Sequence, residues 1–391
     1  MFLEFAWNAW EKRKLGEVVE RVTRKNRDLV STRPLTISAQ DGLVDQRKFF
    51  SKTVASKNIS NYFLLKAGDF AYNKSYSVGY PWGAVKRLDK YPSGVLSTLY
   101  IVFKPKKINS QFLVTYFEGT TWYVSVSKVA SEGARNHGLL NISASDFFDQ
   151  QLFFPTKKTE QESIGLTIKV LDDLIAATQD KIDALEQAKK ALLQRLFDQS
   201  WRFKGYSDPW EKRKVSDYLC ESRIPGSNGL KAKKLTVKLW GKGVVPKNET
   251  YSGSIKTKYY VRSANQLIYG KLDFLHAAFG IVPQSLDGWE STIDSPAFDV
   301  NTSIGNAAFL LALFLRPNFY LREGIRANGS RKAKRIHEDT FLSMSISAPQ
   351  RKEQDQIAVV LDKTELLIAA TQSRLSSLEL LKKALLQDLF I

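Results

Sequence analysis

Hydrophobic positions in two stretches of the chain recur with alternating spacings of four and three residues. The first stretch lies within residues 156–200 and the second within residues 350–391. The positions are Ile164, Ile168, Leu171, Ile175, Thr178, Ile182, Leu185, Lys189, Leu192 and Leu196, then Ile357, Leu361, Thr364, Ile368, Thr371, Leu375, Leu378, Lys382, Leu385 and Leu389. Such spacing over about five heptads predicts coiled-coil helices. About 38 helical residues extend on the order of 57 Å.

Polar residues interrupt both seams at matching points, Thr178 with Thr371 and Lys189 with Lys382. Polar seam residues commonly fix the register of paired helices at some cost in stability. Two roles remain open for these helices. They either pack the protein together and do no more, or they also act as a ruler between two domains.

An internal repeat organises the rest of the chain. The sequence WEKRK at residues 10–14 recurs at 210–214, and LIAATQ at 174–179 recurs at 367–372, followed in each case by KKALLQ and then Leu-Phe. Each unit is therefore an opening segment, a divergent globular body and a long helix. We expect domains at 1–155 and 201–349, with helices at 156–200 and 350–391.

The two bodies have the texture of mixed helix and strand. Residues 68–103 and 241–301 alternate apolar or aromatic residues with Gly and Pro breaks, which predicts short strands and turns. Phe70, Phe274 and Phe279 are expected in the cores. The predicted fold class is α/β (α+β), in two tandem copies.

The excess of positive charge is confined to the bodies. The chain has a net charge of +18, of which residues 1–150 carry +9 and residues 201–349 carry +10, while residues 151–200 carry −1 and residues 350–391 carry none. A polyanion is the obvious partner for two basic bodies joined by neutral helices. This distribution is typical of a protein whose bodies bind phosphate backbones.

Several function classes lack their sequence signatures. No G-x-x-x-x-G-K-[ST] loop is present, His137, His276 and His337 are scattered, and Ser207–Trp210 lacks the second proline of a D-P-P-Y methyltransferase box. The single cysteine, Cys220, fits a reducing cytoplasm. No apolar run is long enough for a membrane span, and Met1–Asn8 does not have the features of a signal peptide. We expect no metal site and no catalytic residues.

Polar, basic and aromatic residues on predicted loops are the candidates for DNA contact, because they can bond to phosphates and base edges. In the first body these are Asn73, Lys74, Tyr76, Ser77, Tyr80, Trp82, Lys86 and Arg135. In the second body they are Lys242, Lys247, Lys256, Lys258, Tyr259, Arg262, Lys271 and Arg331.

Over nearly its full length the chain resembles the specificity subunits of type I restriction-modification systems, the HsdS family. The resemblance is carried by the two WEKRK openings, by GDFAYNKSYSVGYPWGAVK, GVLSTLYIVF and EGARNHGLLNIS in the first body, by GKGVVPKNE, TKYYVR, YGKLDFLHAAFGIVP and ESTIDSPAFD in the second, and by the two LIAATQ…KKALLQ helices. It implies a pseudo-twofold protein with two target recognition domains, joined by two long antiparallel helices.

The resemblance also implies a function. Each domain would read one half of a split, asymmetric site on double-stranded DNA, and the chain would be non-catalytic. Two methyltransferase subunits and two restriction or motor subunits would be its partners, and these would use S-adenosylmethionine, ATP and Mg²⁺. The expected location is the bacterial cytoplasm, without a membrane.

Two other classes remain as alternatives. A stand-alone DNA-binding regulator would bind duplex tightly without partners. A fused restriction-methylation enzyme would need a nucleotide-binding loop and a D/N-P-P-Y/F box.

Overall fold

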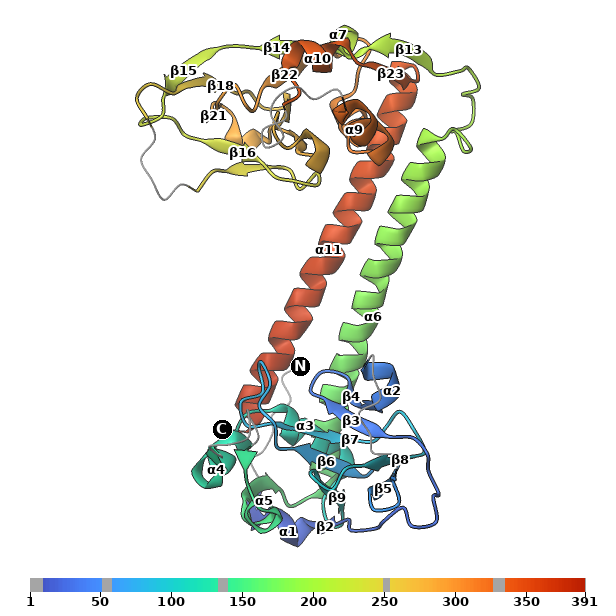
Figure 1. Cartoon of the computed structure of the whole chain (residues 1–391), viewed down its shortest axis with the longest axis vertical. Coiled ribbons are helices and arrows are strands. Elements are labelled where there is room, and N and C mark those ends of the chain that lie inside the picture. The colour runs from blue at the N-terminus through green and yellow to red at the C-terminus, as the bar shows by residue number, and fades with distance from the viewer. Residues whose placement is uncertain (1–9, 51–57, 133–139, 249–253, 326–334, 391) are drawn as a thin grey trace. The chain divides into compact units, whose positions relative to one another are not determined.

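A computed structural model describes residues 10–50, 58–132, 140–248, 254–325 and 335–390. The chain divides into two compact units, residues 1–181 with 371–391 and residues 182–370. We call them unit 1 and unit 2, and call the globular part of each its body. Each unit contains part of both long helices, α6 (Lys158–Phe197) and α11 (Arg351–Leu389) (Figure 1). None of the helices in the described ranges is long and apolar enough to cross a membrane.

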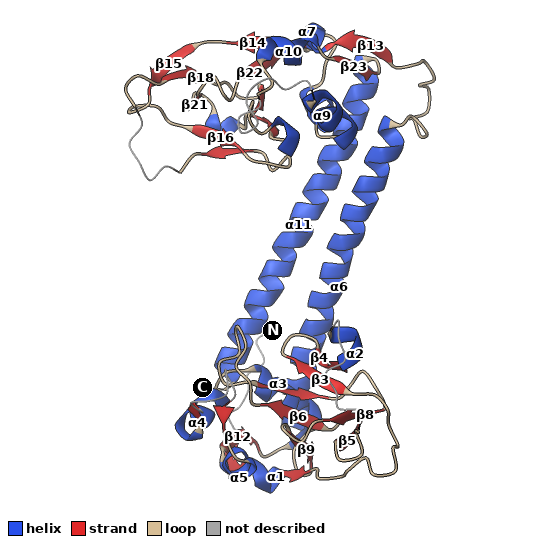
Figure 2. Cartoon of the chain, viewed as in Figure 1, coloured by secondary structure: helices blue, strands red, loops and turns tan. Residues whose placement is uncertain are grey.

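The first body is built around a four-stranded antiparallel sheet in the order β2-β9-β6-β7. Two antiparallel pairs, β3-β4 and β5-β8, lie beside it (Figure 2), and β1 pairs with β12, the strand that precedes α6 in sequence. The strands are β1 Trp10–Lys14, β2 Val19–Arg21, β3 Leu35–Ser38, β4 Gly42–Asp45, β5 Phe63–Lys66, β6 Phe70–Asn73, β7 Ala84–Arg87, β8 Ser93–Leu96, β9 Ile101–Pro105, β10 Ser131–Glu132, β11 Leu140–Asn141 and β12 Gln151–Pro155. The helices are α1 Leu15–Val18, α2 Gln46–Phe49, α3 Ser110–Glu118, α4 Trp122–Val129 and α5 Ala144–Asp149.

The second body repeats this plan. Its central sheet has the order β14-β22-β19-β20, and β13 pairs with β23 as β1 does with β12. The strands are β13 Glu211–Lys214, β14 Leu219–Ser222, β15 Pro225–Asn228, β16 Leu235–Val237, β17 Val244–Pro246, β18 Lys258–Val261, β19 Leu267–Tyr269, β20 Phe279–Ile281, β21 Glu290–Ser291, β22 Ala297–Val300 and β23 Ser345–Ala348. The helices are α7 Val215–Tyr218, α8 Ala307–Phe314, α9 Pro317–Gly324 and α10 Glu338–Ser343, with 3₁₀ turns η1 Phe274–His276 and η2 Gln284–Leu286.

The bodies therefore share a frame and differ at its edge. The first WEKRK opening forms β1, and residues 211–214 of the second form β13. Each of these strands pairs with the strand that precedes a long helix. The second body has a three-stranded sheet, β15-β18-β21, where the first has the β5-β8 pair. The predicted mixed fold with an internal repeat is confirmed, and Phe70, Phe274 and Phe279 are buried in the cores as expected.

The predicted heptad seam positions are buried or half-buried along both helices. Ile164, Ile168 and Leu171 of α6 are enclosed, as are Ile357 and Leu361 of α11. In each unit the helices run antiparallel, because the start of one shares a hydrophobic cluster with the end of the other. Leu389 packs against the cluster that contains Ile164 in unit 1, and Leu196 and Ile357 belong to one cluster in unit 2.

An aromatic group closes each body on the end of a long helix. In unit 1 the ring of Phe390, which follows α11, lies 6.3 Å from Trp10 and 5.8 Å from Phe112, centroid to centroid. In unit 2 Phe197, the last residue of α6, lies 5.9 Å from Trp210 and 5.4 Å from Phe309. The phenylalanine at the end of each repeated helix is thus a core residue of a body. Phe390, after α11, belongs to the core of the first body, and Phe197, at the end of α6, belongs to the core of the second.

A glutamine near the start of each long helix ties it to its own body. Gln161 donates to Pro155 O at 2.7 Å and accepts from Asn109 N at 2.8 Å. Gln354 repeats this with Pro349 O at 2.9 Å and Asn306 N at 2.9 Å. Both asparagines also cap the following helix, α3 or α8. The amides satisfy backbone groups that burial would otherwise leave unpaired.

Replacing Phe390 by Ala should destabilise unit 1 by about 3–5 kcal/mol, since a buried ring would leave a cavity. Replacing Phe197 by Ala should do the same to unit 2. Hydrogen exchange read by mass spectrometry would locate the loss. Leu380→Ala, at an exposed position of α11, is the control and should change little. Loosening of unit 2 by Phe390→Ala to the same extent as unit 1 would contradict the assignment.

Candidate nucleic-acid interface

The connection from β6 to β7 carries five of the predicted contact residues of the first body, Lys74, Tyr76, Ser77, Tyr80 and Trp82. Ser77 and Tyr80 exchange backbone hydrogen bonds, with Tyr80 N to Ser77 O at 2.8 Å, and close a tight turn at Val78 and Gly79. Gly79 has φ of +81°, which suits glycine in this turn. Tyr76 is exposed, and Val78 is 91% exposed. Tyr76 and Ser77 therefore lie on a projecting turn, where a polar or aromatic side chain is free to contact a ligand.

The base of this turn is fixed by the residues that flank it. Tyr72 Oη donates to Trp82 O at 2.8 Å, and Lys74 Nζ donates to Ile142 O at 3.2 Å. A Cβ on Gly83 would lie 2.0 Å from Asn73 O, so the strands approach too closely there for any other residue. The hydrogen bond from Lys74 gives that lysine a structural role in addition to any contact with DNA.

Lys86 lines a cavity of about 350 Å³ that also receives Glu118, Asp172 and Lys382. Burial lowers the pKa of Lys86, although the nearby carboxylates oppose this. For Lys382 burial also opposes the charge, but Glu118 Oε2 at 2.9 Å and the hydrogen bond to Asp172 raise its pKa. The polar seam residue Lys382 is therefore the centre of an ion-pair group within unit 1.

In the second body the predicted residues divide into two groups. Four lysines are exposed. Lys242 lies on the β16–β17 turn and Lys247 follows β17, whereas Lys256 precedes β18 and Lys258 is its first residue. Arg262 and Lys271 lie in the interior, 2% and 3% exposed, and Tyr259 is also buried. A buried cation cannot bind a phosphate in this conformation, so the structure does not support the predicted DNA contacts of Arg262 and Lys271.

Arg262 is a structural centre of its body. Its guanidinium donates to Ser291 Oγ at 2.7 Å, Ser222 O at 2.8 Å and Ser295 O at 3.2 Å. Burial lowers the pKa of Arg262 to about 10, which still leaves it charged at neutral pH. The residue joins β14, β21 and the segment that follows β21.

Lys271 holds the end of β19 in place. Its Nζ lies 2.6 Å from Glu338 Oε1, at the start of α10. Lys74 stands at the matching position of the first body, after β6, and bonds to Ile142 O instead. Both lysines thus tie the central sheet to the segment that returns towards a long helix. Arg135 and Arg331, the remaining two candidates, lie outside the described residues.

One exposed aromatic was missed by the sequence analysis. Trp240 stands at the tip of the β16–β17 turn and is 56% exposed, with Lys238 and Lys242 exposed on either side. The sequence signal was the alternation of lysine with tryptophan and glycine in KLWGKG. Basic residues interleaved with an aromatic are typical of nucleic-acid-binding surfaces.

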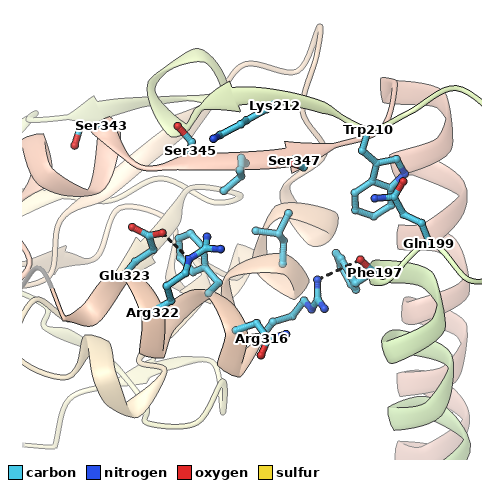
Figure 3. Close-up of a pocket in the computed structure, with 14 residues that line it drawn as sticks. Phe197, Gln199, Trp210, Lys212, Arg316, Arg322, Glu323, Ser343, Ser345 and Ser347 are labelled. Carbon is cyan, nitrogen blue, oxygen red and sulfur yellow. Dashed lines mark hydrogen bonds and ion pairs between the residues drawn. The ribbon is translucent and has the colours of Figure 1, made fainter.

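A pocket with a volume of about 620 Å³ lies in unit 2 (Figure 3). Lys212, Arg316 and Arg322 give its lining three cations against the single carboxylate of Glu323, which pairs with Arg322 at 2.9 Å. Burial lowers the pKa of Arg316, whose guanidinium lies over the Phe197 ring. This lining is suited to an anionic group. No group of His, Cys, Asp or Glu able to hold a metal ion occurs in the part of the chain that the structure describes.

No family model matches the chain, and no curated protein matches its sequence. Solved structures are similar over almost all of it. The HsdS subunit of Thermoanaerobacter tengcongensis aligns with a TM-score of 0.53 at 15% identity, covering 98% of this chain and 97% of that one. The type I restriction-modification S subunit of M. genitalium aligns with a TM-score of 0.59 at 12% identity, covering 100% and 98%.

A third structure aligns with a TM-score of 0.53 at 14% identity, covering 98% of both chains. It comes from work on the structural basis of complex assembly and conformational transition of the type I R-M system. At these identities the likeness shows the fold. The chain has the fold of type I restriction-modification specificity subunits, and the predicted fold class, two tandem bodies of mixed helix and strand with two long helices, is confirmed.

Replacing Arg262 by Ala should lower the free energy of unfolding by about 3 kcal/mol or more, because a charged donor of three buried hydrogen bonds is lost. Lys258→Ala, at an exposed position on β18, is the matched control and should stay within about 0.5 kcal/mol of the parent protein. Denaturant melts of both variants measure this. An Arg262→Ala protein of unchanged stability that no longer binds DNA would instead make Arg262 a contact residue.

Proposed function

We propose that this chain is the DNA sequence-recognition subunit of a type I restriction-modification complex. It binds a bipartite, asymmetric target on double-stranded DNA and directs partner subunits to methylate adenine or to cleave DNA. The observation that carries the proposal is the match of fold over the whole length of three solved chains from such systems. The position of the excess positive charge on the two bodies supports it.

The two bodies bind one half-site each in this proposal. Exposed lysines on the edge of the second body supply phosphate contacts, whose strength falls with salt. The projecting turn of the first body, with Tyr76 and Ser77, supplies contacts to base edges, each worth about 1–3 kcal/mol of discrimination. Because the bodies share their frame and differ in these loops, the two half-sites differ and the target is not palindromic.

The chain is non-catalytic in this proposal and binds no cofactor of its own. S-adenosylmethionine, ATP and Mg²⁺ belong to the partners, two methyltransferase subunits and two restriction or motor subunits, in the bacterial cytoplasm. The methyltransferase must take the target adenine out of the base stack, since its reacting atom is not accessible within the duplex. This chain contributes position, by holding the flanking duplex.

The long helices offer a surface for the methyltransferase subunits. Leu166, Val170 and Leu174 are exposed at successive i, i+4 positions, which lie on one face of α6 in unit 1. Val359 and Leu367 are the repeat equivalents of Leu166 and Leu174 on α11 in unit 2, and they are exposed too. Lys363 stands at the equivalent of Val170, so two of the three apolar positions recur. A similar exposed face in each unit fits two copies of one partner.

Exchange of residues 1–150 for the corresponding body of another family member should change one half of the methylated motif and leave the other half intact. The exchanged body brings its own loops but keeps the frame that α6 and Phe390 complete. Co-expression with the methyltransferase partner and sequencing of the methylated genome measure the motif. Alteration of both halves would refute the one-body, one-half-site assignment. A chain that binds duplex tightly without any partner, and with which no methyltransferase co-purifies, would favour a stand-alone regulator.

Insertion of one heptad before Leu174 together with one before Leu367 should lengthen the unread gap of the target. Seven helical residues add about 10 Å, close to the rise of three base pairs. A heptad keeps the buried seam in phase, so the helices stay paired. Methylome sequencing gives the gap length. An unchanged gap would leave the helices with a packing role alone.

A further inference from the structure

The turn between β16 and β17, residues 238–243, presents an aromatic ring to solvent. Trp240 is 56% exposed, and its neighbour Leu239 is 39% exposed. Tryptophan is the largest apolar side chain, so its exposure at a turn gives up burial that folding would otherwise use. Its position therefore calls for a reason other than the stability of the body.

The backbone holds Trp240 in place at a cost. Its φ is +60°, in the left-handed region that residues with a Cβ rarely adopt. Trp240 N donates to His276 O at 2.8 Å, and Gly241 N donates to Ala277 O at 2.9 Å. These two bonds clamp the tip of the turn to the end of η1. Strain that is maintained by surrounding structure is commonly found at functional sites.

The ring itself is fixed by one neighbour. The His276 ring meets the Trp240 indole edge to face, with centroids 5.6 Å apart. Asp273 Oδ1 lies 3.5 Å from His276 Nδ1. The indole is thus oriented before any ligand arrives, while more than half of it stays accessible.

The charge around the ring is positive. Lys238 and Lys242 are exposed on either side of it. The corresponding turn of the first body, between β3 and β4, has no aromatic residue, and there Ser38 Oγ donates to Asp41 at 2.8 Å. The feature is therefore a property of the second body and does not belong to the shared frame.

We propose that Trp240 stacks on a base at an unstacked step of the half-site that the second body binds, with Lys238 and Lys242 on the flanking phosphates. This inference rests on the function proposed above and names the contact within it. Every base has a face on which an indole can stack, and aromatic wedges between base steps bend or open a duplex. The fixed orientation of the ring lowers the entropy lost on binding.

The test uses the full chain in complex with its methyltransferase partner, on duplexes that carry the methylated motif. Trp240→Ala should weaken binding by roughly 5- to 150-fold, the range expected from loss of one base-aromatic stack, and Trp240→Phe should restore most of it. Trp201→Ala removes another partly exposed tryptophan of unit 2 and is the matched control. Because Trp240 and Trp201 are both exposed, thermal melts of the variants should match that of the parent.

A base analogue provides a second readout that a structural role of Trp240 would not change. 2-Aminopurine placed at successive positions of the second body's half-site should brighten at one position with the parent complex and stay dark with Trp240→Ala. Lys238→Ala and Lys242→Ala should each reduce the slope of log affinity against log salt by about one.

Equal affinity and equal 2-aminopurine signals for the parent and Trp240→Ala would overturn the inference while leaving the proposed function intact. An equal loss of affinity on an unrelated duplex would overturn the assignment to the half-site. A parent complex that neither binds nor methylates a bipartite site would refute the proposed function and, with it, the role of Trp240.

Discussion

The closure of each body by the end of a long helix is the contact on which the rest of the structure depends. Phe390 packs with Trp10 and Phe112 in unit 1, and Phe197 packs with Trp210 and Phe309 in unit 2. The core of the first body therefore needs Phe390, which is far from the rest of that body in sequence. The first body cannot complete its core before residue 390 is present. Each long helix is fixed both at the body that it leaves and at the body that it enters.

The shared frame and the differing loops are held by separate interactions. Gln161 and Gln354 make the same hydrogen bonds to the proline and asparagine beside them, so the junction of body and helix is the same in both units. The β3–β4 and β16–β17 turns take no part in these hydrogen bonds. Loops can therefore change without disturbing the frame, which is the physical condition for a protein whose two bodies recognise different sequences.

Basic residues of the second body fall into a buried group and an exposed group. Arg262 and Lys271 are interior cations whose donors are used by carbonyl, hydroxyl and carboxylate oxygens of the protein itself. Lys242 and Lys258 face solvent. Net charge counts the two groups together, so it overstates how many of the cations are exposed to a polyanionic partner. The frame of the body requires some of the positive charge for its own cohesion.

The sequence by itself determined the repeat, the two long helices with their buried seams and the mixed fold of the bodies, because heptad spacing and strand alternation are local patterns that report directly on secondary structure. It also located the projecting turn at Tyr76 and Ser77, where glycine and proline interrupt the strands. Only the tertiary structure decided that Phe197 and Phe390 are core residues of the bodies, that Arg262 and Lys271 are enclosed, and that Trp240 is exposed. Burial depends on which distant segments pack together. An arginine that bonds to Ser222 and Ser295 and a lysine that faces water have the same local signature, and a tryptophan that sequence reasoning would place in a core reaches solvent here because the backbone at position 240 turns into a left-handed conformation held by His276.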